Sequence, residues 1–418
     1  MNSIERLNAA LAHKQPDRVC VDFGSTLVTG MSVVAVTKLR RALLGDDGYR
    51  VKVVDPYQML GEIDPALREA IGADVMPVMG SRTLFGFENT DWKPFTMFDG
   101  TEVLVPGRFN VTESERGGWV IYPEGDTSVP PSGWMPKDGF YFDALCRQDP
   151  IDEAHLNPED NLEEFGPLSD DEVRHFARQA EAARAQGMGA VLSAPGTGFG
   201  DIALVPAMWL KRTRGIRDVQ EWYMSTISRR DYVYAVFEKQ CEIALDNLGR
   251  LAKALGDTVQ AAFVTGTDFG QQHGTFIAPA VYRELYQPFH KQITAFIHKH
   301  TPWKTFIHSC GSVAALIPDF IASGFDILNP VQCSAAGMDA QALKREYGKD
   351  LVFWGGGVDT QKTLPFGTPG EVYNEVRERI AIFNAGGGYV FNAIHNLQAN
   401  SPVENMLAMF RAIKDSVG

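Results

Sequence analysis

The pair of residues best suited to binding a metal together is His308 and Cys310, which are separated by one serine and followed by Gly311. An apolar run at 303–307 precedes them, which predicts that the pair ends a buried strand. Side chains two residues apart on a strand point to the same face, so both can reach one ion. Zinc accepts neutral imidazole and thiolate together. The spacing therefore predicts half of a zinc site.

The best candidate for a third ligand is His395, because it follows a second apolar run at 389–391. Cys241 lies in a helical pattern and Cys333 follows a different predicted strand, so both are weaker candidates. A closed structural zinc site needs four protein ligands, whereas three good ones are found here. The alternative is that these histidines are hydrogen-bonded structural residues and that the cysteine is a small buried hydrophobe.

The elements that must position these residues alternate along the chain. Eight apolar runs are predicted as buried strands, at 19–24, 73–78, 189–193, 259–264, 304–308, 326–329, 350–354 and 388–392. Helical spacing of apolar residues follows most of them, at 224–255, 279–298, 313–323, 372–383 and 403–417, and a further helix is predicted at 3–13. Such alternation favours a parallel sheet covered by helices, and about eight strands favour closure into a (β/α)8 TIM barrel of the α/β class.

One segment departs from this alternation. Residues 84–136 are rich in aromatics, glycine and proline and contain short alternating runs, which predicts a β-rich insertion after the second strand of a single domain spanning 1–418. Two helix starts carry a hydroxyl residue, a proline and then a glutamate at capping-box spacing, namely Thr368 with Glu371 and Ser401 with Glu404. We therefore expect Glu404 to cap a helix and not to act in catalysis.

Polar residues follow the predicted strands, and in a barrel these strand ends converge on one mouth. We predict catalytic roles for Asp268 and His395 at that mouth. The substrate-binding candidates are Asp22, Gln271, Asn329, Asp359, Asn392 and Asn396. Each has an ordinary alternative, since an aspartate such as Asp268 also caps loops by accepting backbone N–H groups.

Composition narrows the classes of function. The chain has 418 residues, 44% of them hydrophobic and 22% charged, with a net charge of −13. An acidic protein without a basic run is not expected to bind nucleic acid or an anionic membrane. The N-terminus lacks the pattern of a signal peptide, no apolar stretch is long enough to span a bilayer, and five scattered cysteines do not form a disulfide framework. We therefore expect a cytoplasmic protein that acts on a small molecule.

The chain resembles the uroporphyrinogen decarboxylase superfamily over nearly all of its length outside the insertion. The segments that carry the resemblance are 6–11 with Pro16-Asp17-Arg18, His308-Ser-Cys310-Gly311, Gly356-Gly357-Val358-Asp359, Phe366-Gly367-Thr368-Pro369, and 389–405 with Asn392, His395, Ser401, Glu404 and Asn405. The resemblance is specific in the last hundred or so residues and looser before them. It implies a (β/α)8 barrel.

The resemblance implies two chemistries. True uroporphyrinogen decarboxylases use no metal and carry an N-terminal arginine-rich segment that holds substrate carboxylates. Here that place reads Val21-Asp22-Phe23-Gly24-Ser25-Thr26, without arginine. The other branch comprises methyltransferases that work with corrinoid proteins and bind zinc through a His-x-Cys pair and a later cysteine. This chain has the pair, but His395 stands at the place of the late cysteine.

From this departure we predict a zinc-dependent methyltransferase that moves a methyl group from a small methylated substrate, such as a methyl ether, to a corrinoid acceptor on a partner protein. Zinc with one thiolate and two imidazoles is a stronger Lewis acid than thiolate-rich zinc, which suits a leaving oxygen. Asp268 would then donate a proton or position the substrate. The alternatives are a metal-independent decarboxylase or lyase acting on a small carboxylated substrate, and a non-enzymatic ligand-binding relative. A homodimer is left open.

Overall fold

The computed structural model describes residues 1–162 and 165–416, and within them eight parallel strands form one sheet. The strand order is β1-β16-β15-β14-β13-β12-β11-β4, with every neighbouring pair parallel. The strands are β1 (Cys20–Val21), β4 (Val75–Val78), β11 (Gly189–Ser193), β12 (Ala261–Thr265), β13 (Lys304–His308), β14 (Ile327–Asn329), β15 (Val352–Trp354) and β16 (Tyr389–Phe391). All eight predicted strands are confirmed, mostly in shorter form.

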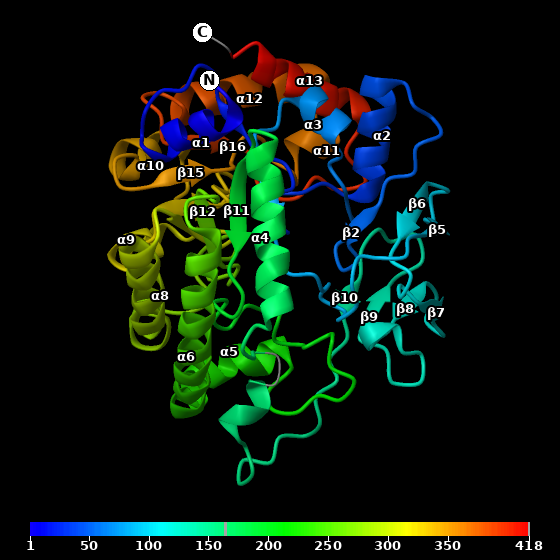
Figure 1. The fold of residues 1–418 in the computed structure, drawn as a ribbon, viewed down its shortest axis with the longest axis vertical. Helices are drawn as coiled ribbons and strands as arrows, with labels where there is room; N and C mark the ends of the chain where they lie inside the picture. Colours follow the sequence, from blue (N-terminus) through cyan, green and yellow to red (C-terminus); the bar gives the residue numbers. More distant parts are fainter. Residues whose placement is uncertain (163–164, 417–418) are drawn as a thin grey trace.

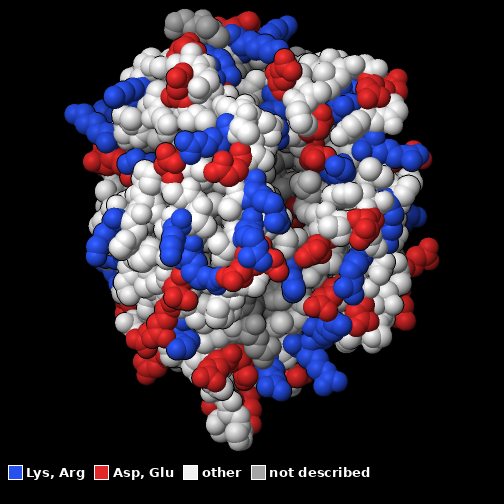
Figure 2. All heavy atoms as spheres, in the orientation of Figure 1, with Lys and Arg blue, Asp and Glu red and all other residues white. Residues whose placement is uncertain are grey.

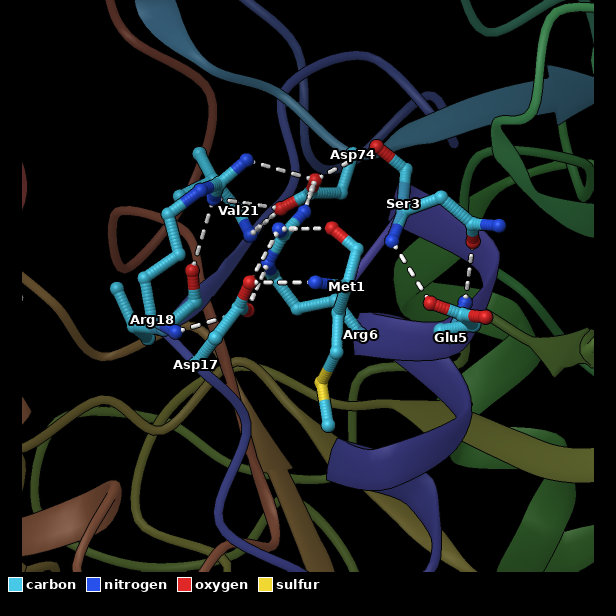
Figure 3. A network of polar contacts seen from close by, with 10 residues as sticks. Met1, Ser3, Glu5, Arg6, Asp17, Arg18, Val21 and Asp74 are labelled. Atoms are coloured by element: carbon cyan, nitrogen blue, oxygen red, sulfur yellow. Dashed lines mark hydrogen bonds and ion pairs between the residues drawn. The ribbon is translucent and has the colours of Figure 1, made fainter.

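The gap between the two outer strands, β1 and β4, is bridged by Asp74. The Asp74 backbone N–H donates to Val21 O at 2.7 Å, and the Asp74 carboxylate accepts the Val21 N–H at 3.0 Å. Arg6 and Arg18 both form ion pairs with this fully buried carboxylate, at 2.6 and 2.8 Å (Figure 3). The sheet is therefore a nearly closed barrel, as predicted.

The interior of the barrel is filled by side chains from its own strands, including Val191, Phe306 and Trp354, which pack in one buried cluster. Leu7 and Leu11 of helix α1 (Ser3–Leu11) join this cluster and cover one end of the barrel. Because that end is plugged, only the opposite end, where the strands finish, is left for a site.

Helices surround the sheet, and those after β4 follow the barrel strands in turn (Figure 1). They are α2 (Val33–Leu44), α3 (Pro65–Ile71), α4 (Asp170–Ala185), α5 (Val219–Ser228), α6 (Arg230–Leu255), α7 (Pro279–Val281), α8 (Gln287–His300), α9 (Ile317–Ala322), α10 (Ala340–Tyr347), α11 (Thr363–Phe366), α12 (Pro369–Phe383) and α13 (Val403–Lys414). The helix predicted at 224–255 is divided into α5 and α6 at Arg229. Among the described residues, no helix has the length and apolar character needed to cross a membrane.

The two predicted capping boxes have different outcomes. Thr368 caps α12 as predicted, because its side chain accepts the Glu371 N–H and the Glu371 carboxylate accepts the Thr368 N–H. The box at Ser401 is wrong: α13 starts after Pro402 and has no side-chain cap. Val417, at the end of the helix predicted at 403–417, lies outside the described residues.

The segment between β4 and β11 contains two antiparallel sheets, which confirms the predicted β-rich insertion (Figure 1). One sheet pairs β5 (Lys93–Thr96) with β6 (Glu102–Val105), and the other has the order β10-β9-β8-β7. Its strands are β7 (Val111–Glu113), β8 (Trp119–Ile121), β9 (Gly133–Met135) and β10 (Asp143–Ala144), so the last strand lies beyond residue 136. A hairpin of β2 (Val53–Asp55) and β3 (Leu60–Gly61), absent from our predictions, precedes α3.

Acidic and basic side chains are interspersed on the face shown in Figure 2. Many of them form exposed ion pairs, such as Arg184 with Asp257 at 2.9 Å. The face shown in Figure 2 has no continuous basic stripe, which agrees with the net charge of −13.

Candidate metal and substrate site

The ends of β13 and β16 bring together the three residues predicted as metal ligands. His308 is the last residue of β13, Cys310 lies two residues later, and His395 lies in the loop that follows β16. One ligand atom from each of the three lies within 4.8 Å of the others. The rings of His308 and His395 have their centroids 5.5 Å apart and are tilted by 72°. Residues far apart in the sequence thus form one cluster of two imidazoles and a thiol.

His308 is held in the tautomer that a metal needs. Its Nδ1 lies 2.5 Å from Asn329 Oδ1, and Asn329 Nδ2 donates to Trp354 O at 2.8 Å. Because the amide nitrogen of Asn329 is fixed as donor, its oxygen accepts a proton from His308 Nδ1. Burial lowers the pKa of His308 to about 4, against the opposing effect of Asn329. The ring is therefore neutral at pH 7 and presents the lone pair of Nε2 toward Cys310.

Cys310 and Asp268 are joined through the backbone. Asp268 Oδ1 accepts the Cys310 N–H at 2.7 Å and lies 3.8 Å from His308 Nε2. Burial raises the pKa of the Cys310 thiol, and the carboxylate of Asp268 raises it further. Burial also raises the pKa of Asp268. A divalent ion would supply the positive charge that both groups lack.

His395 is positioned by a loop that two asparagines hold in place. Asn396 Oδ1 accepts the Gly30 N–H at 2.5 Å, and Asn392 Nδ2 donates to Asp22 O at 2.8 Å. The pKa of His395 is lowered, first by burial and then by the neighbouring His308 ring. The imidazole is therefore neutral and available as a ligand.

The donor set, two neutral imidazoles and a thiol, fits zinc in its chemistry, and the one spacing known within it fits a tetrahedral ion. Zinc–nitrogen bonds of about 2.1 Å and a zinc–sulfur bond of about 2.3 Å place tetrahedral ligand atoms roughly 3.4–3.7 Å apart. Cys310 Sγ and His308 Nε2 are 3.4 Å apart. Asn329 also supplies the outer hydrogen bond that orients metal-binding histidines in general. His395 would be the third donor to such an ion.

The cluster opens into a cavity of about 1150 Å³. His308, His395 and Asp268 form part of its wall, and aromatic residues such as Tyr57, Trp209 and Phe263 form another part. The insertion contributes to the lining through Leu84, Glu124 and Ala144. The cavity therefore lies between the mouth of the barrel and the segment inserted after β4.

The residues predicted to bind substrate are placed differently from the metal candidates. Asp22, Asn329, Asn392 and Asn396 are almost fully buried, and their side chains bond to Trp354 Nε1, His308 or backbone groups of the barrel mouth. Asp359 accepts the N–H groups of Gln361 and Lys362, and Gln271 is exposed. None of these six described side chains belongs to the lining of the cavity. Their role in substrate binding stays a prediction, whereas their role in supporting the loops is observed.

Asp201 is a cavity residue absent from our predictions. It ends the glycine-rich loop 196–201 that follows β11, so the rule applied to the other strand ends would have included it. Burial raises the pKa of Asp201 to about 6, against the hydrogen bond from the Ala203 N–H, and the charge of Asp268 adds to the rise. The Tyr223 hydroxyl, from α5, donates to Asp268 O at 2.7 Å and fixes the same region from outside the lining.

Comparison with known proteins supports the family and the fold. The family model for uroporphyrinogen decarboxylase (URO-D) matches residues 205–416. A methylated-thiol–coenzyme M methyltransferase from Methanosarcina mazei is 26% identical over 192 residues, which is 41% of this chain and 48% of that protein, so the match spans about half the length of the curated relative.

The fold comparison covers the whole chain. A solved structure described as a methyltransferase from Methanosarcina mazei covers 99% of both chains with a TM-score of 0.54 and 12% identity. At that identity the likeness concerns the fold, including the barrel that carries His308 and His395. Together with the family match over half of the sequence, it shows that this chain belongs to the uroporphyrinogen decarboxylase (URO-D) family.

Proposed function

We propose that this protein is a zinc-dependent methyltransferase that moves a methyl group from a small methylated donor to a corrinoid acceptor. The observation that carries the proposal is the cluster of His308, Cys310 and His395 within 4.8 Å of one another, whose two histidines line a large cavity. The similarity to a methyltransferase that acts on methylated thiols supports the reaction class. The donor and the acceptor partner are part of the proposal.

A bound zinc would act as a Lewis acid for the oxygen that the methyl group leaves. The protein's own residues have three tasks. His308 and His395 stay neutral through burial and keep their lone pairs available. Asp268, held by the Cys310 N–H, is placed beside the cluster, where it can deliver a proton to a leaving oxygen. Aromatic side chains of the cavity wall, Phe263 among them, would contact the apolar part of the donor.

The acceptor must reach the same place. A corrinoid carried by a partner protein would approach through the open side of the cavity, because the other end of the barrel is plugged by Leu7 and Leu11. The methyl group then passes directly from donor to acceptor, with no covalent intermediate on the protein. The chain's contribution is to bind both partners in line and to hold the leaving group.

The proposal is tested by methyl transfer in vitro. Purified protein loaded with zinc is mixed with a panel of methoxylated compounds and free cob(I)alamin, and the absorbance change of methylcobalamin formation is followed. Cys310→Ala should abolish the activity, and Cys333→Ala, at a half-buried cysteine outside the ligand cluster, is the matched control. Release of carbon dioxide from a carboxylated substrate by metal-free protein would instead favour the decarboxylase alternative.

A further inference from the structure

The cavity contains a carboxylate, Asp201, that the proposed reaction does not use. Three other carboxylates of the lining have partners, since Glu124 pairs with Lys211 and Glu172 and Asp218 accept N–H groups at helix starts. Asp201 lines the cavity together with Asp268, and its Oδ1 accepts the Ala203 N–H at 2.9 Å. Its Oδ2 lies against the backbone that leads from β12 to Asp268, since a Cβ added to Gly266 would come within 2.7 Å of that oxygen. A side chain at position 266 would therefore displace the Asp201 carboxylate from its present place.

No lysine or arginine pairs with Asp201 or Asp268 among the residues that the structure describes. Two cationic side chains line the cavity, Arg82 and Arg217. Arg82 is exposed, and the buried Arg217 guanidinium donates to the carbonyl oxygens of Arg214 and Asp160. The negative charge of Asp201 thus has no counterion in the described part of the wall.

A zinc ion would be held by His308, Cys310 and His395, and Asp201 is not one of these ligands. Asp268 carries a proton in the proposed reaction, so Asp201 is the carboxylate that remains available to a cationic ligand. The wall beside these groups is aromatic, with Tyr57, Trp209 and Phe263 in the lining. Aromatic faces combined with a carboxylate attract organic cations through cation–π and Coulomb interactions.

We propose that Asp201 determines the specificity of this cavity by binding a cationic group of the methyl donor. The donor is then an organic cation with an apolar part about the size of an aromatic ring, and anionic compounds are excluded. This inference rests on the proposed function only where it calls the bound molecule a methyl donor. The binding preference itself requires neither methyl transfer nor a corrinoid, so its failure and that of the proposed reaction are separately observable.

The test is a binding comparison on the full-length protein with three probes that share one methoxyarene body. The probes are para-methoxybenzylamine, which is cationic at pH 7, the neutral para-methoxybenzyl alcohol, and the anionic para-methoxyphenylacetate. Isothermal titration calorimetry should show the amine binding at least about tenfold more tightly than the acid. Titrations repeated after treatment with a chelator separate this preference from direct binding of the acid to a metal.

Two variants assign the preference to one residue. Asp201→Asn keeps the shape of the side chain and the acceptor for Ala203, and should weaken amine binding about tenfold while changing alcohol binding less than about threefold. The matched control is Asp246→Asn, which removes a negative charge from an exposed position of α6 outside the cavity and should change neither.

Three results would overturn the inference. The acid could bind the chelator-treated protein as tightly as the amine, or the amine could fail to bind at millimolar concentration. Alternatively, Asp201→Asn could weaken the binding of all three probes equally. Asp201 would then support its loop and would not select ligands by charge. A thermal melt of each variant tests whether it is folded, so that weaker probe binding is not mistaken for unfolding.

Discussion

Replacing Asn329 by leucine should weaken zinc binding although Asn329 never touches the metal. In the native protein, Asn329 Oδ1 accepts the proton of His308 Nδ1 at 2.5 Å, which leaves Nε2 free for an ion. In Asn329→Leu the zinc-bound ring keeps its Nδ1 proton in a buried place with no acceptor, at a cost of about 1–3 kcal/mol. The metal-free ring escapes this cost, because it can carry its proton on Nε2, toward the Asp268 carboxylate 3.8 Å away.

The penalty therefore falls on the metal-bound state alone. A loss of about 1.4–2.8 kcal/mol corresponds to a 10–100-fold weaker affinity, which is the range usual for outer partners of metal-binding histidines. Competition with a chromophoric chelator measures the zinc dissociation constant directly. Asn329→Asp is the matched control, since it also loses the hydrogen bond to Trp354 O at 2.8 Å but keeps an acceptor for the ring. Equal zinc affinity in Asn329→Leu and the native protein would refute this reasoning.

Three further results are expected. Asp74→Asn should lower the free energy of unfolding by about 3–5 kcal/mol in denaturant titrations, because Arg6 and Arg18 lose their shared buried partner; a loss below about 1 kcal/mol would argue against the bridge between β1 and β4. Thr368→Ala should cost about 1 kcal/mol through loss of the α12 cap, measured in the same way. In metal-free protein, the stability contributed by His308 should fall as pH drops from about 6.5 toward 4, because its pKa is lowered and only the unfolded chain takes up its proton in that window. Buried Asp22 and Asp55, whose pKa is raised to about 6, act in the opposite direction, so the measurement is the difference in melting temperature between the native protein and His308→Gln; a difference that does not change with pH would contradict this assignment.

The barrel was predictable from the sequence because its strands are buried on both faces. Runs such as 352–354 and 389–391 are apolar without interruption, and helical spacing follows them, which leaves few other folds open. The error at Ser401 has a local cause, because Pro402 itself is the N-cap residue of α13. A four-residue sequence pattern does not show which residue is the first with helical backbone angles.

The site was only partly predictable. His308 and Cys310 share a strand end and a short spacing, so their proximity followed from the sequence alone. The sequence does not show which polar residue faces the cavity and which one faces the backbone. Asn329 ends a strand exactly in register with His308, yet it bonds to that ring instead of lining the cavity. Asp201 enters the cavity from the loop after β11, and its carboxylate lies against Gly266, which is far along the chain.

The central claim is that His308, Cys310 and His395 bind one catalytic metal ion. Elemental analysis of protein purified without chelator measures it most directly, together with the variants Cys310→Ala and His395→Ala. The expected result is about one zinc per chain in the native protein and strongly reduced zinc in both variants. Native protein without zinc that cannot be loaded with it, or variants that retain full occupancy, would contradict the account.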